Sequence, residues 1–107
     1  MNSFGEYIKQ LRKERNLNQT QVAVQVGLDS GGLSKVETGK KMLKEVKLPL
    51  LADALSISLD ELNIQFFSDK YAKECFKYKC SPEVFHVAEE KVNYIKSTNT
   101  TQTKLNF

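Results

Sequence analysis

Basic side chains gather in the first half of this sequence, where they could bind phosphate groups. Nine basic residues occur between positions 9 and 47: Lys9, Arg12, Lys13, Arg15, Lys35, Lys40, Lys41, Lys44 and Lys47. Four acidic residues lie in the same stretch: Glu14, Asp29, Glu37 and Glu45. An excess of this size is also common on solvated helices, so it indicates a nucleic-acid partner only together with a motif that presents the charges.

Cys75, Cys80 and His86 are the residues whose types could bind a metal ion. Their C-x4-C-x5-H spacing fits no common zinc pattern, and a fourth ligand is missing. Two reduced, partly buried thiols are therefore the simpler interpretation. The sequence also has no nucleophile-base pair, carboxylate pair or phosphate-binding glycine loop. We expect neither an enzyme nor a bound metal or cofactor.

The length and composition fit one small domain with an appendage. The chain has 107 residues, of which 40% are hydrophobic and 27% charged, with a net charge of +3, and it can bury one modest core. No apolar run approaches the ~20 residues that span a bilayer, and the first residues lack the pattern of a signal peptide. These features predict a cytoplasmic protein with no membrane partner.

The basic stretch overlaps a series of short amphipathic helices. Three residues can cap helix starts: Ser3, Asn18 and Asp29. The helices expected after these caps reach from Ser3 to about residue 16 and cover residues 19–26 and 30–38. Glu6 and Gln21 stand three residues after the first two caps and complete capping boxes, while Gly39 would end the third helix.

The second half of the chain predicts three further helices. Pro49 fits only the first turn of the fourth helix, because proline inside a helix removes a hydrogen bond. Ser58 can cap the fifth helix, in which no breaker occurs before about residue 79. Ser81-Pro82-Glu83 is a strong start for a sixth helix. From Ser97 the chain is polar and unpatterned, which predicts a disordered tail over residues 98–107.

Residues 19–36 carry the most specific pattern. Apolar residues form two short helical stripes there: Val22, Ala23, Val26, Leu28, Leu33 and Val36. Ala23 is small enough for close helix approach, and Gly27 can adopt the left-handed conformation that ends a helix. This is the pattern of a helix-turn-helix, whose second helix usually enters the major groove of DNA.

With these elements in place, the stretch from Phe4 to about Leu62 resembles the Xre/Cro family of helix-turn-helix regulators, which includes phage repressors. The matching residues are Ile8, Leu11-Arg12, Leu17-Asn18-Gln19, Val22-Ala23, Val26-Gly27, Leu33-Ser34-Lys35-Val36-Glu37, Gly39-Lys40, Leu51-Ala52-Asp53-Ala54-Leu55 and Ser58-Leu59-Asp60-Glu61-Leu62. The resemblance implies an all-α fold, a five-helix lambda-repressor-like DNA-binding domain with a C-terminal helical extension. We expect the domain to cover residues 1–63 and the extension residues 64–97.

The resemblance also implies roles for individual residues. Gln19 matches a position that holds a DNA phosphate. Four residues match the groove-facing positions of the recognition helix: Ser30, Gly31, Ser34 and Lys35. Arg12 and Glu37 match a charged pair that links the first helix to the third and orients both toward the DNA backbone. The alternative for Arg12 and Glu37 is that they are merely exposed charges.

Physical chemistry agrees with these roles. A helix amino terminus attracts phosphate, and Gln19 adds a side-chain donor there. Lys40, Lys41 and Lys44 would attract DNA independently of its sequence. Lys35 is the only long side chain among the groove-facing positions, and lysine can donate to guanine O6 or N7. Lys35 is therefore our candidate for base readout.

Gly31-Gly32 departs from the family pattern, which often has long polar side chains there. Each glycine lowers helix propensity by roughly 1 kcal/mol relative to alanine, and neither can read a base edge. The doublet could let the helix sit deeper in the groove, leave room for a thymine methyl group or water, or mark a helix that orders on DNA.

The C-terminal helices, residues 66–96, have no motif that we can connect to chemistry. They have more aromatic residues than a five-helix domain needs to cover. They could fold back on their own domain, but we predict that they form a homodimer, because a two-fold dimer matches palindromic half-sites.

Together these features predict a sequence-specific regulator of transcription that binds double-stranded DNA, most simply a repressor. The alternative is an antitoxin or a restriction-modification controller protein whose residues 66–96 bind a protein partner.

Overall fold

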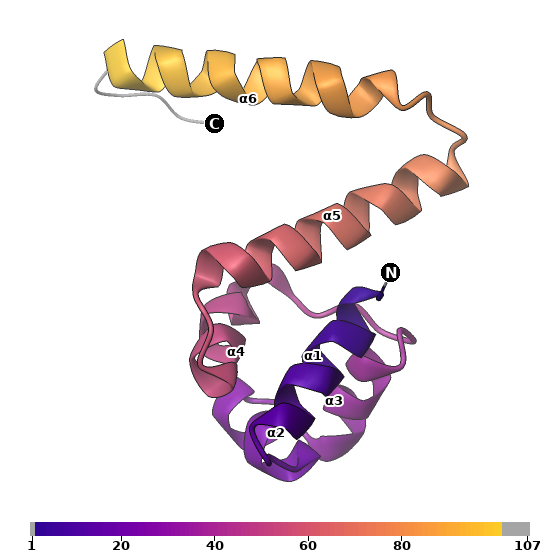
Figure 1. Ribbon diagram of the computed structural model, residues 1–107, viewed down its shortest axis with the longest axis vertical. Helices are drawn as coiled ribbons and strands as arrows, with labels where there is room; N and C mark the ends of the chain where they lie inside the picture. Colours follow the sequence, from indigo (N-terminus) through magenta and orange to yellow (C-terminus); the bar gives the residue numbers. More distant parts are fainter. Residues whose placement is uncertain (1, 102–107) are drawn as a thin grey trace. The chain divides into compact units, whose positions relative to one another are not determined.

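The computed structural model describes residues 2–101, and this part of the chain is all-helical, as expected (Figure 1). Its elements are α1 (Phe4–Glu14), α2 (Gln19–Val26), α3 (Ser30–Glu37), the 3-10 helix η1 (Glu45–Lys47), α4 (Leu48–Leu55), α5 (Leu59–Lys77) and α6 (Glu83–Thr101). The chain divides into two compact units after Ala72, within α5. No helix in the described residues is long and apolar enough to cross a membrane.

The predicted helix starts are confirmed. In the first capping box, the Glu6 N–H donates to Ser3 Oγ over 3.2 Å, and the Ser3 N–H donates to Glu6 Oε1 over 3.2 Å. The hydrogen bond from the Ser3 backbone is the main cause that lowers the pKa of Glu6. Asn18 and Gln21 form the same box with two 2.8 Å bonds. Such bonds satisfy backbone donors that have no acceptor within the helix.

Helices α1 to α5 all end in the same way, in a Schellman motif. At the end of α2, Gly27 is left-handed with φ 74°, and the Leu28 N–H donates to the Ala23 carbonyl over 2.8 Å. The five pairs joined by this bond are Arg12–Leu17, Ala23–Leu28, Lys35–Lys40, Ala52–Ile57 and Cys75–Cys80. The motif brings the side chains of each pair together, and an apolar contact often results.

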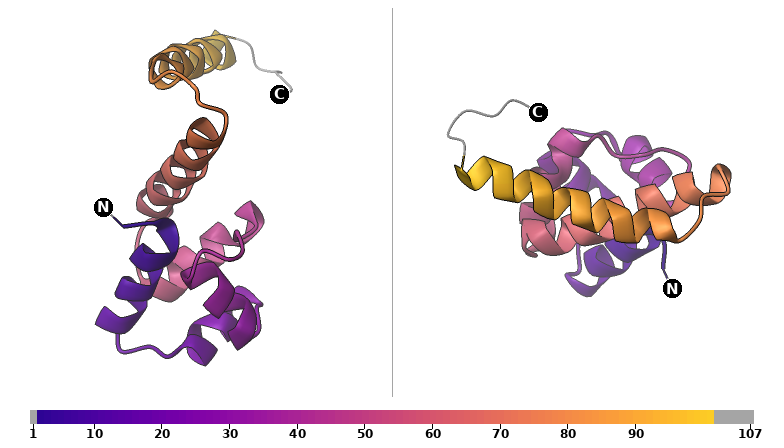
Figure 2. Two further views of the ribbon diagram at one scale, coloured as in Figure 1. Left: turned by 90° about the vertical axis from the view of Figure 1, so that its right-hand side faces the viewer. Right: turned by 90° about the horizontal axis from the view of Figure 1, so that it is seen from above.

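One hydrophobic core lies in the first unit, where α1 to α4 gather with the amino-terminal part of α5 (Figures 1 and 2). Its buried residues are Phe4, Ile8, Val22, Ala23, Val26, Leu33, Val36, Leu43, Leu48, Leu51, Ala52, Ala54, Leu55, Leu62 and Phe66. The Phe66 ring packs edge-on against Phe4 with a centroid distance of 5.1 Å.

The packing of Phe66 shows that the domain boundary predicted between residues 63 and 64 is wrong. Its side chain is only 2% exposed, and the compact unit continues to Ala72. Leu62 and Phe66 are four residues apart on one face of a continuous helix, so one turn beyond the family pattern still packs into the core. Nothing in the local sequence marks the point where this packing stops.

The second correction concerns the predicted disordered tail, residues 98–107. Helix α6 continues through Thr101, and the Thr98 hydroxyl donates to the Ile95 carbonyl over 3.0 Å. Residues 97–101 contain neither glycine nor proline, and polar residues can continue a helix until a breaker occurs. Residues 102–107 lie outside the described part of the chain.

Gly5 has a packing role that the sequence pattern did not reveal. It is buried where α1 crosses the carboxyl end of α3. A Cβ atom at this position would lie 2.5 Å from the Val36 carbonyl oxygen and closer still to that of Glu37. Only glycine therefore allows α1 to approach the α3 backbone this closely.

Candidate nucleic-acid interface

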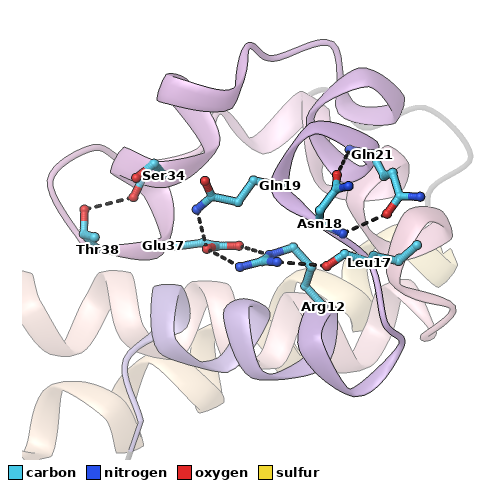
Figure 3. A network of polar contacts seen from close by, with 8 residues as sticks. All are labelled: Arg12, Leu17, Asn18, Gln19, Gln21, Ser34, Glu37 and Thr38. Carbon is cyan, nitrogen blue, oxygen red and sulfur yellow. Dashed lines mark hydrogen bonds and ion pairs between the residues drawn. The ribbon is translucent and has the colours of Figure 1, made fainter.

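A buried ion pair joins α1 to the carboxyl end of α3 (Figure 3). Arg12 Nε donates to Glu37 Oε2 over 2.7 Å, and Arg12 Nη2 donates to Glu37 Oε1 over 3.1 Å. The two residues are 7% and 4% exposed. The predicted pair is thus present, and the alternative that Arg12 and Glu37 are exposed charges is wrong.

The pair belongs to a larger polar network that reaches α2 (Figure 3). Arg12 Nη1 donates to the Leu17 carbonyl over 2.8 Å, in the turn between α1 and α2. Gln19 Nε2 donates to Glu37 Oε1 over 3.0 Å, from the first residue of α2. No buried side-chain nitrogen or oxygen in residues 2–99 lacks a hydrogen-bond partner. The network therefore fixes the first three helices relative to one another without an unsatisfied charge.

Gln19 lies half-buried at the start of α2, where the sequence predicted a phosphate contact. Its bond to Glu37 fixes the orientation of the amide group. An amide carries two N–H groups, so Gln19 can donate to Glu37 and to an external acceptor at the same time.

The predicted groove-facing residues all lie in α3. Ser30, Gly31 and Lys35 are exposed, whereas Ser34 is half-buried. The Ser30 hydroxyl lies 2.9 Å from the Thr20 hydroxyl, which connects the starts of α3 and α2. The Ser34 carbonyl accepts a 2.9 Å bond from the Thr38 hydroxyl (Figure 3).

The two glycines of α3 have different environments. The Gly32 N–H donates to the capping oxygen, Asp29 Oδ1, and a Cβ at Gly32 would lie 2.9 Å from that oxygen. A Cβ at Gly31 would lie 3.7 Å from it, an ordinary contact distance. Gly32 thus leaves room for the helix cap, while the packing gives no reason for glycine at position 31.

The predicted phosphate-binding lysines follow α3 directly. The N–H groups of Lys40 and Lys41 both donate to the Lys35 carbonyl, over 2.8 and 3.2 Å. Lys41 and Lys44 line a hollow of about 110 Å³ beside α3. Lys35, Lys40 and Lys41 therefore lie at the carboxyl end of α3, and these three residues and Lys44 are all exposed.

Lys47 makes polar contacts that the sequence analysis did not predict. Its Nζ donates to the carbonyls of Val26 and Gly27, over 3.0 and 3.3 Å. A cation at the carboxyl end of α2 interacts favourably with the helix dipole. No local signal could have predicted it, because the residues are about 20 positions apart.

The cysteines and the histidine lie away from this network along the chain. Within the described residues no three His, Cys, Asp or Glu side chains are grouped to hold a metal ion. His86 Nε2 instead lies 3.2 Å from Glu90 Oε1, one turn further along α6.

Two short helices, α2 and α3, held to α1 by a buried ionic network and followed by exposed lysines, define a helix-turn-helix DNA-binding domain. The sequence model of the Helix-turn-helix family matches residues 8–62. The chain belongs to this family and is of the Xre/Cro type.

Named relatives share the same region. The HTH-type transcriptional repressor RghR of Bacillus subtilis (strain 168) is 40% identical over 63 residues, which are 58% of this chain and 47% of RghR. The chain thus spans about half the length of RghR. Control protein C.MunI of a Mycoplasma species is 40% identical over 67 residues, 62% of this chain and 85% of C.MunI.

A solved structure is also similar. The restriction-modification controller protein C.AhdI from Aeromonas hydrophila superposes with a TM-score of 0.52 at 36% identity. The match covers 55% of this chain and 89% of C.AhdI, and it supports the predicted lambda-repressor-like fold.

Proposed function

We propose that this protein is a cytoplasmic regulator of transcription, most simply a repressor, that binds double-stranded DNA sequence-specifically as a homodimer. The observation that carries this proposal is the placement of Lys35 and Lys40 at the end of α3. Similarity to the repressor RghR supports the direction of regulation.

The Schellman motif pairs these two lysines, whereas it pairs Ala23 with Leu28 at the end of α2. Both side chains are exposed, so their ammonium groups can approach the same stretch of a phosphate backbone. Lys41, whose N–H donates to the same carbonyl, adds a third positive charge.

The proposed mechanism divides the contacts into two kinds. Gln19, Lys40, Lys41 and Lys44 would contact phosphates and set the position of the domain on the duplex. Ser30, Gly31, Ser34 and Lys35 would face the base edges. Arg12 and Glu37 would act as positioning residues, because they hold Gln19 and α3 in fixed orientation.

Fluorescence polarisation with duplex DNA tests this proposal. A preferred operator is first selected from random duplexes, and its affinity is compared with that of a scrambled duplex over a range of salt concentrations. Lys35→Ala should reduce discrimination between the two by about 1–3 kcal/mol. Lys40→Ala should weaken both alike and lower the salt slope by about 1.

Lys9→Ala, an exposed lysine on α1, is the matched control and should change neither quantity. The proposal fails if the protein binds no duplex at low salt, or if binding does not depend on salt.

The proposed dimer rests on the exposed apolar face of α6. Val84, Phe85, Val92 and Ile95 are 43%, 48%, 48% and 38% exposed, and their spacing places them on one side of the helix. A second copy of the chain could cover this stripe, and two-fold symmetry would then present two recognition helices to a palindromic operator.

Sedimentation equilibrium checks the dimer. We expect a mass of two chains, and we expect the double variant Phe85→Glu/Val92→Glu to sediment as one chain, because charges on the stripe oppose its burial. Asn93→Glu, on the polar side of α6, should leave the dimer intact. A wild-type monomer at concentrations that saturate the operator would contradict this part of the proposal.

A second candidate function is control of a restriction-modification system. The matches cover most of C.MunI and C.AhdI, 85% and 89% of their lengths. In this case residues 66–96 would bind a protein partner. Selection of bound fragments from genomic DNA distinguishes the two functions, because a controller would enrich fragments next to restriction-modification genes.

A further inference from the structure

The carboxyl end of α5 places two cysteines at the paired positions of a Schellman motif. The Cys80 N–H donates to the Cys75 carbonyl over 2.9 Å, and the Lys79 N–H donates to the Phe76 carbonyl over 3.3 Å. Lys79 is left-handed, with φ 55°. These features lie within ten residues of each other and do not depend on the rest of the fold.

The same positions at the ends of α2 and α4 hold apolar pairs, Ala23–Leu28 and Ala52–Ile57. At α5 both positions hold thiols, so the contact that the motif favours is a sulfur–sulfur contact. Burial, and then a hydrogen bond with the Cys80 thiol, raises the pKa of Cys75.

A disulfide requires Cα atoms roughly 4.4–6.8 Å apart and Cβ atoms that point toward each other. The backbone hydrogen bond between Cys75 and Cys80 holds these residues close together. Both thiols are reduced, Cys75 is half-buried and Cys80 is exposed. A small oxidant can therefore reach the pair from the Cys80 side.

We propose that Cys75 and Cys80 form a dithiol modification site that hydroperoxides convert to an intramolecular disulfide. The Cys80 thiolate attacks one peroxide oxygen, the O–O bond breaks, and a sulfenic acid forms as the first water leaves. The Cys75 sulfur then attacks the Cys80 sulfur, the S–S bond forms, and the hydroxyl group leaves with a proton as the second water. Two thiols lose two electrons in total, and one hydrogen peroxide becomes two waters.

The disulfide would close the end of α5 covalently and fix the turn that leads to α6. It would involve no residue of the recognition helix or of the Arg12–Glu37 network. This inference is therefore independent of the proposed function, and it can fail or succeed without affecting it.

Mass spectrometry of the full-length chain tests the site. The reduced protein is treated with hydrogen peroxide in small excess, blocked with a thiol reagent and digested with trypsin without reduction. Because Lys77 and Lys79 lie between the cysteines, digestion separates residues 74–77 from residues 80–91. We expect the intact mass to fall by about 2 Da and the two peptides to remain joined until a reductant is added.

Four variants test the site and whether the fold positions the pair. Cys75→Ser and Cys80→Ser should accumulate singly oxidised thiol and no joined peptide. Lys79→Pro removes the N–H and cannot adopt a positive φ, so disulfide formation should slow by roughly tenfold. Lys79→Gly preserves the left-handed conformation and should keep the wild-type rate.

Joined peptides from one chain, formed faster in wild type than in Lys79→Pro, support the site. The proposal is overturned if wild type gives only singly oxidised thiols or disulfides between chains. Equal rates in wild type and Lys79→Pro would also overturn it, because the motif would then not position the sulfurs.

Discussion

Replacing Glu37 with alanine is expected to lower the free energy of unfolding by about 3–5 kcal/mol. The Arg12 guanidinium is bonded to both Glu37 oxygens and is nearly inaccessible to water. Without Glu37 it would remain buried as an uncompensated charge, and Gln19 would lose its acceptor. Urea denaturation followed by circular dichroism measures the change.

Two further variants show whether the loss of stability in Glu37→Ala comes from the buried Arg12 charge. Asp53→Ala removes an exposed carboxylate from α4 and should change stability by less than about 0.5 kcal/mol. The double variant Arg12→Met/Glu37→Leu removes both charges together and should recover most of the loss. An unchanged stability in Glu37→Ala would show that the pair is not buried as described.

The double variant also separates stability from orientation. It should fold, but Gln19 would no longer be fixed by Glu37. If the pair orients Gln19 toward phosphate, this folded variant should bind DNA more weakly than wild type. If the double variant bound DNA with the same affinity as wild type, the Arg12–Glu37 pair would have a structural role only.

Gly5→Ala is expected to destabilise the protein by up to about 3 kcal/mol, although alanine is the better helix former. The added methyl group would overlap the Val36 and Glu37 carbonyls. These are backbone atoms of α3 and cannot rotate away, so α1 would have to move. The same shift would stretch the Arg12–Glu37 pair, and DNA affinity should fall together with stability.

Gly31→Ala is the matched control for Gly5→Ala. It also places alanine at a helical glycine, but its methyl group would have no closer neighbour than 3.7 Å. It should therefore stabilise the protein by about 0.5–1 kcal/mol. If both variants became more stable in urea denaturation, the close approach of α1 to α3 would be refuted.

The local features of this fold could be predicted from the sequence because each depends on a few neighbouring residues. Ser3, Asn18 and Asp29 cap the helices that follow them, as expected. Pro49 lies in the first turn of α4. Each of these features is decided by backbone hydrogen bonds within about five residues of the chain.

Contacts between distant residues could not be predicted in this way. Arg12 and Glu37 are 25 positions apart, and only family resemblance suggested that they meet. Composition and spacing alone were equally consistent with Arg12 and Glu37 being two separate, exposed charges. No family resemblance pointed to Gly5 or Lys47, and their contacts were not predicted. Phe66 was assigned to the C-terminal extension, although it packs into the core of the first unit.

The sequence by itself determined that this is a helix-turn-helix protein, because periodicity, caps and the left-handed Gly27 are local properties. Only the tertiary structure decided how the helix-turn-helix is held: by a buried charge network, by a glycine contact between α1 and α3, and by Lys47 at the end of α2. These interactions depend on burial and on distances between separate helices, which exist only once the core has formed.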